Sequence, residues 1–236
     1  MALQLEDDYL ANRILLALPR ATLQRISPHL ELVSLQQGQV IYHPEARIQK
    51  IYFINRGLVS LVRRMRDGRS IEIGAIGIEG VAGLGALFGI PEATLESVVQ
   101  LPGTAFCGNP DVIRQVGRGR YFESLLQRYY HLLASQIAQT AACNRLHTLQ
   151  ERCCRWLLIA HDSARSDNFA LTHEFLATML GAQRAGVSIA ANALARAGLI
   201  HYVRGRMRIL NRRGLEAAAC ECYTTIHQLV HRLFHT

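Results

Sequence analysis

The chain has 236 residues, of which 50% are hydrophobic and 19% are charged, a composition typical of folded rather than disordered protein. This length suits two compact domains, each with its own core. No apolar run approaches the roughly 18 residues of a membrane span, and the first residues are acidic, unlike a secretory signal. We therefore expect a cytoplasmic protein with no membrane partner, in which the six cysteines are free thiols.

The N-terminal half predicts short helices followed by short strands. Residues 7–33 have a helical pattern that Pro19 interrupts. Alternating apolar residues then predict strands at 38–42, 51–54, 58–62 and 70–74, with Gly57 separating the second from the third. Asp67-Gly68 is a strong hairpin signal between the last two. Short strands at regular spacing indicate a sandwich or a barrel-like roll, which we expect to end near Pro110.

The helical period returns after the roll. Residues 121–161 contain neither glycine nor proline, and a seam with alternating spacings of four and three predicts a long helix. The seam residues are Leu126, Tyr130, Leu133, Ile137, Thr140, Asn144 and His147. This stripe could pack against its own domain or pair with a second copy of the chain. We expect pairing, in which Asn144 fixes the register at a cost in stability. A hinge is expected at 147–150, then a helix over 151–161 and a polar loop at 163–168.

Residues 171–198 predict a helix-turn-helix. Thr172 is a favourable N-cap for a first helix, and Gly181 can end that helix in the left-handed conformation. A second helix begins near Arg184, with Val187, Ile189 and Ala190 among its apolar residues, and ends at Gly198. Two short helices around a tight glycine-containing turn form a helix-turn-helix.

A strand, a turn and a strand follow at residues 199–210, with arginines around Gly205 at the turn. This pattern predicts a wing that lies along a phosphate backbone. The alternative, a helix pair packed on an ordinary hairpin, does not explain the arginines. In a docked helix-turn-helix, the first residues of the second helix reach base edges, and an arginine there can bind guanine in bidentate fashion. The expected DNA contacts are Thr172, Gln183, Arg184, Ser188, Arg204, Arg206 and Arg208.

The distribution of charge supports this interpretation. The net charge is +8, yet residues 175–215 contain no Asp or Glu and seven arginines. A solvated surface normally mixes both signs, so this segment indicates a phosphate-binding face. The seven residues are Arg184, Arg196, Arg204, Arg206, Arg208, Arg212 and Arg213.

From about residue 30 to 215, the sequence resembles the Crp–Fnr family of transcription regulators. Residues 51–61 match the strand-turn-strand signature of its sensor domain, Asp67-Gly68-Arg69 matches its hairpin, and 171–200 match its helix-turn-helix. The resemblance implies an α+β fold. A cyclic-nucleotide-binding-like β-roll would occupy residues 1–120, a long dimerisation helix and hinge 121–149, and a winged helix-turn-helix 150–236. It further implies a homodimer that binds a palindromic double-stranded DNA operator and contacts RNA polymerase.

Two regions depart from the family pattern. Members that bind cyclic AMP carry Gly-Glu for the ribose and Arg for the phosphate, where this chain has Gly83-Leu84 and either Thr94 or Leu95. A buried phosphate without a cation is poorly compensated, so cyclic AMP is not expected to bind in the usual way. The recognition helix has Ala185 and Ile189 where the family often has Glu and a second Arg, so we expect a different operator. The residues expected at the effector pocket are Gly80, Gly83, Leu84, Thr94 and Ile137.

No cofactor or metal site is predicted. An N-terminal iron–sulfur cluster is not expected, because no cysteine precedes Cys107. His43, His131 and His147 are candidate haem ligands, but each is more simply a structural or surface histidine. Cys220-x-Cys222 could bind metal or sense redox state, although small residues on a C-terminal helix explain the pattern more simply.

The sequence contains no Walker loop, no H-E-x-x-H and no G-x-S-x-G, so we do not expect an enzyme. It predicts a sequence-specific, homodimeric DNA-binding regulator with an unknown effector. The alternative is a nucleotide- or haem-responsive signalling module whose C-terminal domain serves protein contacts.

Overall fold

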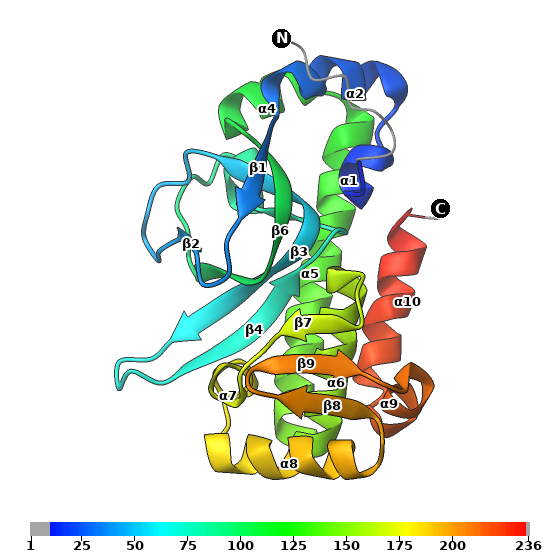
Figure 1. The fold of residues 1–236 in the computed structure, drawn as a ribbon. Coiled ribbons are helices and arrows are strands. Elements are labelled where there is room, and N and C mark those ends of the chain that lie inside the picture. The colour runs from blue at the N-terminus through cyan, green and yellow to red at the C-terminus, as the bar shows by residue number, and fades with distance from the viewer. Residues whose placement is uncertain (1–9, 235–236) are drawn as a thin grey trace. The chain divides into compact units, whose positions relative to one another are not determined.

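The computed structural model describes residues 10–234 and has an α+β fold (Figure 1). The chain divides into two compact units. The first comprises Met1–Leu61, Ala75–Ala134 and Val230–Thr236, and the second comprises Val62–Gly74 and Ser135–Leu229. Within residues 10–234, none of the helices combines the length and apolarity that crossing a membrane requires.

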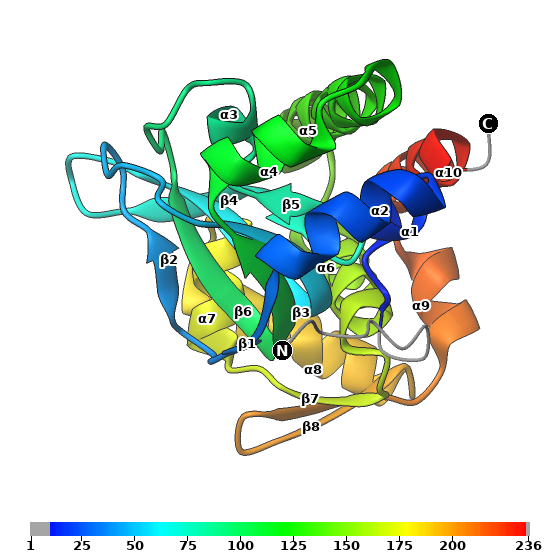
Figure 2. The ribbon, with the colours of Figure 1, turned by 90° about the horizontal axis from the view of Figure 1, so that it is seen from above.

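The first unit opens with the short helices α1 (Arg13–Leu16) and α2 (Arg20–Ile26) and a 3-10 turn, η1 (Ser27–His29). The predicted break at Pro19 is confirmed, while residues 7–9 of the predicted helical segment lie outside the described residues. The side chain of Asn12 caps α1 and also donates to the carbonyls of Ile54 and Gly80, both at 2.8 Å, which ties the helix to the sheet. Figure 2 shows α2 beside α4 (Pro110–Gly117), against which it packs.

An antiparallel sheet of six strands forms the roll. Its main path runs β1-β6-β3-β4, with β2 on β6 and β5 on β3. The strands are β1 (Glu31–Leu35), β2 (Val40–Tyr42), β3 (Ile51–Arg64), β4 (Ser70–Ile76), β5 (Val81–Ala82) and β6 (Glu96–Gly108). A one-turn helix, α3 (Leu84–Leu87), follows β5. Buried side chains from β3 and β6, including Phe53, Leu58 and Phe106, form the core.

The prediction of two separate strands at 51–54 and 58–62 is wrong, because β3 is one continuous strand of 14 residues. Gly57, which suggested the break, lies within the strand at φ +93°. A Cβ at this position would lie 2.5 Å from the carbonyl oxygen of Leu101 on β6. The glycine therefore allows close approach of two strands and does not end one of them.

Two helices join the roll to the C-terminal region, as the sequence predicts. The first, α5 (Arg120–Leu146), is followed after a two-residue break by α6 (Leu149–Ala164). Thr148 and Glu151 form a capping box at this break: Thr148 Oγ1 accepts from the Glu151 amide at 3.3 Å, and Glu151 Oε2 accepts from the Thr148 amide at 2.8 Å. The cap starts a new helix and confirms that one helix ends and another begins at the predicted 147–150 segment.

The second unit contains the predicted winged helix-turn-helix. A core that includes Trp156, Leu176 and Val187 lies beneath its helices. The three-stranded sheet has the order β7-β9-β8, and its first strand begins at Asn168, the last residue of the predicted polar loop. The elements are β7 (Asn168–Ala170), α7 (His173–Leu180), α8 (Arg184–Arg196), β8 (Ile200–Val203), β9 (Arg206–Ile209), α9 (Arg212–Ala218) and α10 (Cys222–Phe234).

Candidate nucleic-acid interface

The helix-turn-helix consists of α7, a short turn and α8. Thr172 caps α7, and its Oγ1 accepts from the amide of Phe175 at 3.2 Å. Gly181 ends α7 at φ +57°, and a Cβ there would lie 2.5 Å from Cδ1 of Ile71. Glycine is therefore required both by the backbone conformation and by the packing. Gln183 is the N-cap residue of α8 and leaves Arg184 in its exposed first turn.

One face of α8 is open to solvent. The buried face carries Val187, Ala190, Ala191 and Leu194, while the exposed face carries Arg184, Ala185, Ile189, Asn192 and Arg196. Ile189 is one of the apolar residues of this helix, and its side chain is 70% exposed. An exposed recognition helix that combines arginine, amide and apolar side chains can contact guanine, adenine and the thymine methyl group.

Arg184 has a weak partner within the protein. Its Nε lies 3.7 Å from Oε2 of Glu174 on α7, and both side chains are more than 70% exposed. Exposed ion pairs contribute little to stability, so this contact leaves the guanidinium available to another partner.

Ser188, one of the expected DNA contacts, is hydrogen-bonded within the protein. Its hydroxyl is hydrogen-bonded to Nδ1 of His173 at 3.0 Å, and the imidazole stacks on Tyr202 of β8 with ring centroids 4.1 Å apart. Burial, followed by the charge of Arg184, lowers the pKa of His173 and favours the neutral ring. Ser188 is half-buried in this contact, which joins α8 to α7 and, through the stacked imidazole, to the wing.

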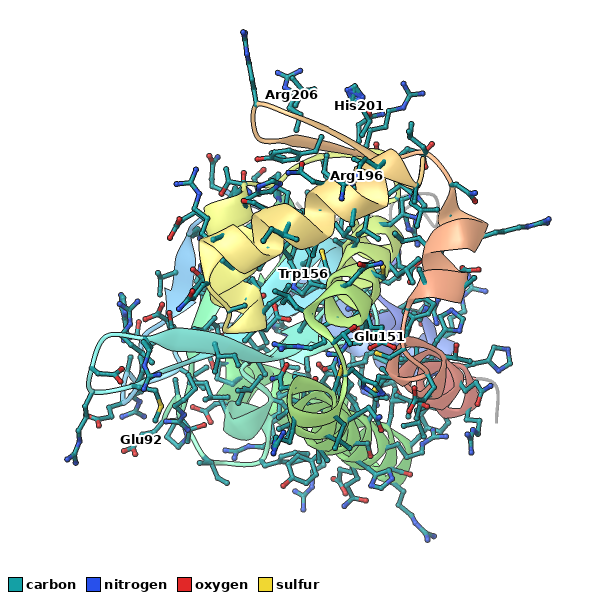
Figure 3. The ribbon with its side chains drawn as sticks, turned by 90° about the horizontal axis from the view of Figure 1, so that it is seen from below. Glu92, Glu151, Trp156, Arg196, His201 and Arg206 are labelled. Carbon is teal, nitrogen blue, oxygen red and sulfur yellow. The ribbon has the colours of Figure 1, made fainter. Side chains whose placement is uncertain are left out.

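The wing is a tight hairpin with a basic outer face. Arg204 and Gly205 both have positive φ, +47° and +78°, which is the geometry of a two-residue type I′ turn. Arg206 and Arg208 are exposed and alternate with the buried Met207 on β9. The register pairs Arg206 with Val203 and Ala170, and Arg208 with His201 and Asn168. These residues line a shallow groove, and Figure 3 shows Arg206 and His201 on the hairpin and Arg196 near the end of α8.

One of the seven arginines does not belong to this basic face. Arg212 donates from Nη1 to Asp162 at 2.6 Å, from Nε to Glu216 at 2.8 Å and from Nη2 to the hydroxyl of Tyr223 at 2.6 Å. Arg212 therefore joins α6, α9 and α10. The inference that every arginine of the acid-free segment faces phosphate is wrong for this residue. All three partners of Arg212 lie outside residues 175–215, so the composition of that segment gave no sign of them.

Side chains of the protein itself pack closely around the first residue of the expected effector pocket. A Cβ on Gly80 would collide with the hydroxyl of the buried Tyr129 from α5. Gly83 has φ +86°, and Leu84 is buried where the resemblance implies a glutamate. Thr94 is exposed, and Ile137 is half-buried in the second unit.

The charge of the segment around the expected effector pocket is unfavourable for an anion. Residues 77–97 contain three glutamates and no lysine or arginine. Glu96 is buried, and Glu79 accepts from the amide of Gly77 at 2.8 Å. Glu92, labelled in Figure 3, is exposed. A phosphate here would meet acceptors and like charge instead of a cation.

The expected dimer seam is only partly exposed. Leu126 and Thr140 are buried within the chain, and Arg155 donates to Oγ1 of Thr140 at 2.9 Å. Tyr130 is 59% exposed, and Leu133, Ile137 and Asn144 are half-buried. The exposed side of α5 carries alanines at 134, 138, 141 and 142. The outward apolar stripe is thus rotated from the seam that the spacing suggested.

Four side chains that the sequence did not connect form a candidate metal site. The ligand atoms of Cys143, His147, Cys220 and Cys222 all lie within 4.8 Å of one another. The Cys220-x-Cys222 pattern pointed to one half of the group. The spacing of Cys143 and His147, one helical turn apart, was the signal for the other half. The other two candidate haem ligands, His43 and His131, are exposed.

Two family models match this chain. A model of the cyclic nucleotide-binding domain matches residues 32–120, and a model of the Crp-like helix-turn-helix domain matches residues 151–218. A comparison with curated proteins gives no match.

Solved structures of regulators share the fold. A Crp-family transcriptional regulator from Thermus thermophilus is 22% identical, with a TM-score of 0.66 over 79% of this chain and 96% of that chain. FixK2 from Bradyrhizobium japonicum is 17% identical, with a TM-score of 0.67 over 81% and 98%. The c-di-GMP-responsive global regulator CLP from Xanthomonas campestris is 14% identical, with a TM-score of 0.60 over 81% and 99%. With a cyclic nucleotide-binding domain followed by a Crp-like helix-turn-helix on this fold, the chain belongs to the Crp–Fnr family of transcription regulators.

Proposed function

We propose that this chain is a homodimeric, sequence-specific DNA-binding regulator that does not use cyclic AMP as its effector. The observation that carries the proposal is the basic surface shared by α8 and the β8–β9 hairpin. Arg184, Arg196, Arg206 and Arg208 are all exposed there, and residues 175–215 contain no acidic side chain. Glu174, just before this segment, makes only the exposed 3.7 Å contact with Arg184. Such a surface attracts a polyanion through charge and releases counterions when it binds.

The two parts of this surface would read DNA differently. The exposed face of α8 enters the major groove, where Arg184 binds O6 and N7 of a guanine. Asn192 can pair with an adenine, and the exposed Ile189 can contact a thymine methyl group. Arg204, Arg206 and Arg208 on the wing bind phosphates, which position the protein without specifying a base.

The outward stripe of α5 would pair with the same stripe of a second copy. Tyr130 contributes an exposed aromatic ring, and the small alanines at 134, 138 and 141 allow close helix approach. Two recognition helices related by a two-fold axis would then read a palindrome, with half-sites about 10 base pairs apart. We further propose RNA polymerase as a protein partner and the cytoplasm as the place of action.

Replacing Arg184 by alanine tests the reading of bases. Binding to the specific operator is expected to weaken by about 1–3 kcal/mol, or about 5- to 150-fold, with relaxed preference at one guanine of each half-site. Binding to a scrambled duplex should change much less. The operator comes from binding-site selection with the purified protein, and fluorescence anisotropy gives both affinities.

Glu174→Gln is the matched control, because it removes the ion-pair partner of Arg184 and keeps the arginine. It should bind the operator at least as tightly as the unchanged protein. An equal loss on the operator and the scrambled duplex in Arg184→Ala would show that Arg184 contacts only phosphate.

Cyclic AMP is expected to leave both the melting temperature and the operator affinity unchanged. A ligand at a hundredfold excess over its dissociation constant adds about 2.7 kcal/mol to the free energy of unfolding, which a melting experiment detects easily. Leu84 replaces the glutamate that would bind the ribose, and the acidic segment 77–97 supplies no cation for the phosphate. The same titration with cyclic di-GMP and cyclic GMP is the comparison, and a clear upward shift with cyclic AMP would refute this assignment of the pocket.

A further inference from the structure

A buried group of three thiols and one imidazole lies outside the DNA-binding surface. Cys143 is in the last turn of α5, and His147 follows the end of that helix. Cys220 precedes α10, and Cys222 is its first residue. All four belong to the second unit, and the three cysteines are at most 5% exposed.

The spacing of the ligand atoms fits a single tetrahedral ion. Sγ of Cys143 lies 3.6 Å from Sγ of Cys220, and Sγ of Cys222 lies 3.5 Å from Nδ1 of His147. Zinc–sulfur bonds of about 2.3 Å place the corners of a tetrahedron about 3.8 Å apart. An iron–sulfur cluster divides its four ligands between two or four irons, so ligands on different irons lie farther apart than the 4.8 Å that contains this whole group.

Neighbouring groups orient the ligands. Nδ1 of His147 faces Cys222, and its Nε2 lies 3.2 Å from Oε2 of Glu221. A metal-binding histidine typically donates its second ring N–H to a carboxylate in this way, which fixes the tautomer. Nε2 of Gln139 donates to Sγ of Cys222 at 3.0 Å, an interaction that stabilises a thiolate.

The surrounding charge also suits a metal-bound group. One divalent cation, three thiolates and a neutral imidazole carry a net charge of −1. Arg155 on α6 donates from Nη2 to Oγ1 of Thr140, which lies one helical turn before Cys143 on α5, at 2.9 Å. Nη1 of Arg155 is buried and has no hydrogen-bond partner within residues 10–234. A negatively charged site nearby would offset this buried cation.

We propose that Cys143, His147, Cys220 and Cys222 form a structural Zn²⁺ site. Three soft thiolates and an imidazole favour zinc over hard cations such as Mg²⁺ or Ca²⁺. The four protein ligands leave no open position, as is typical of a structural and not a catalytic site. The ion joins the end of α5 to the start of α10 and thereby closes the segment that contains the whole winged helix-turn-helix.

The test is the metal content of the full-length protein, purified under reducing conditions without an affinity tag that binds metal. Elemental analysis is expected to find one zinc per chain. Cys143→Ser and Cys222→Ser should each lose most of it, whereas Cys154→Ala, which removes another buried thiol of the same unit, should keep it. Cobalt exchanged into the site should give the visible absorption bands of a tetrahedral thiolate complex.

Two further measurements distinguish the loss of a zinc ligand from the misfolding of a variant. His147→Cys supplies a fourth thiolate and should retain zinc, while His147→Ala should bind it much more weakly. Treatment of the unchanged protein with a strong chelator should lower its melting temperature, and added zinc should restore it. A metal-free protein with a Cys143–Cys220 disulfide would overturn the proposal, as would iron with inorganic sulfide, or full zinc content in both serine variants.

Discussion

Replacing Arg206 and Arg208 together by alanine is expected to weaken binding to every DNA sequence and to flatten its dependence on salt. Each lost phosphate contact removes about 0.9 from the slope of log affinity against log salt concentration. A dimer would lose four such contacts, so the slope should fall by about 3.6. The two arginines share the outer face of β9, where the register leaves both side chains exposed. The measurement is a salt titration on the operator and on a scrambled duplex.

A matched control removes the same two charges elsewhere. Arg20 on α2 and Arg120 at the start of α5 are exposed residues of the first unit, and replacing both by alanine changes the net charge equally. This variant should keep the original salt slope. The proposed wing contacts would be wrong if both double variants lowered the slope equally, or if the wing variant changed the preferred sequence.

Replacing Ala138 by glutamate is expected to convert the dimer into a monomer. Ala138 is exposed on the outward stripe of α5, and glutamate is a good helix former, so the isolated chain should fold normally. In a paired helix the carboxylate would be buried beside its twin, at a cost of several kcal/mol. Because about 1.4 kcal/mol corresponds to tenfold, operator affinity should fall by about 100-fold or more. Light scattering gives the mass, and anisotropy gives the affinity.

Ala21→Glu is the control for this prediction, since it makes the same substitution at an exposed position of a different helix, α2. It should remain dimeric. If the unchanged protein is already a monomer at micromolar concentration, or if Ala138→Glu stays dimeric, the proposed α5 interface is refuted.

Much of the DNA-binding unit could be predicted from the sequence, because its signals are local. Thr172 caps the helix that follows it, and Gly181 has the positive φ that a helix end of this kind requires. Arg204-Gly205 adopts the tight turn expected between two short strands. The hinge after α5 likewise depends on Thr148 and Glu151, only three residues apart. Interactions over such short separations depend little on the rest of the fold.

Local patterns were less informative where a residue had two compatible roles. Gly57 suggested a strand end, but the approach of β6 makes it part of a continuous strand. The 4-3 spacing located α5 but not the rotation of the helix, because apolar or small side chains occur on both its buried and its exposed sides. Which side faces outward depends on what packs against the helix, and spacing alone does not contain that information.

Contacts between distant residues were decided by the tertiary structure alone. Ser188 is hydrogen-bonded to His173, whose imidazole stacks on Tyr202, and Arg212 is held by Asp162, 50 residues before it. Cys143 reaches Cys220 across 77 residues of sequence. The sequence by itself determined most of the elements, their order along the chain and the positions of the arginines in the acid-free segment. Only the fold determined which of these side chains lie in solvent and which meet a partner, because burial and proximity depend on the packing of segments that are remote along the chain.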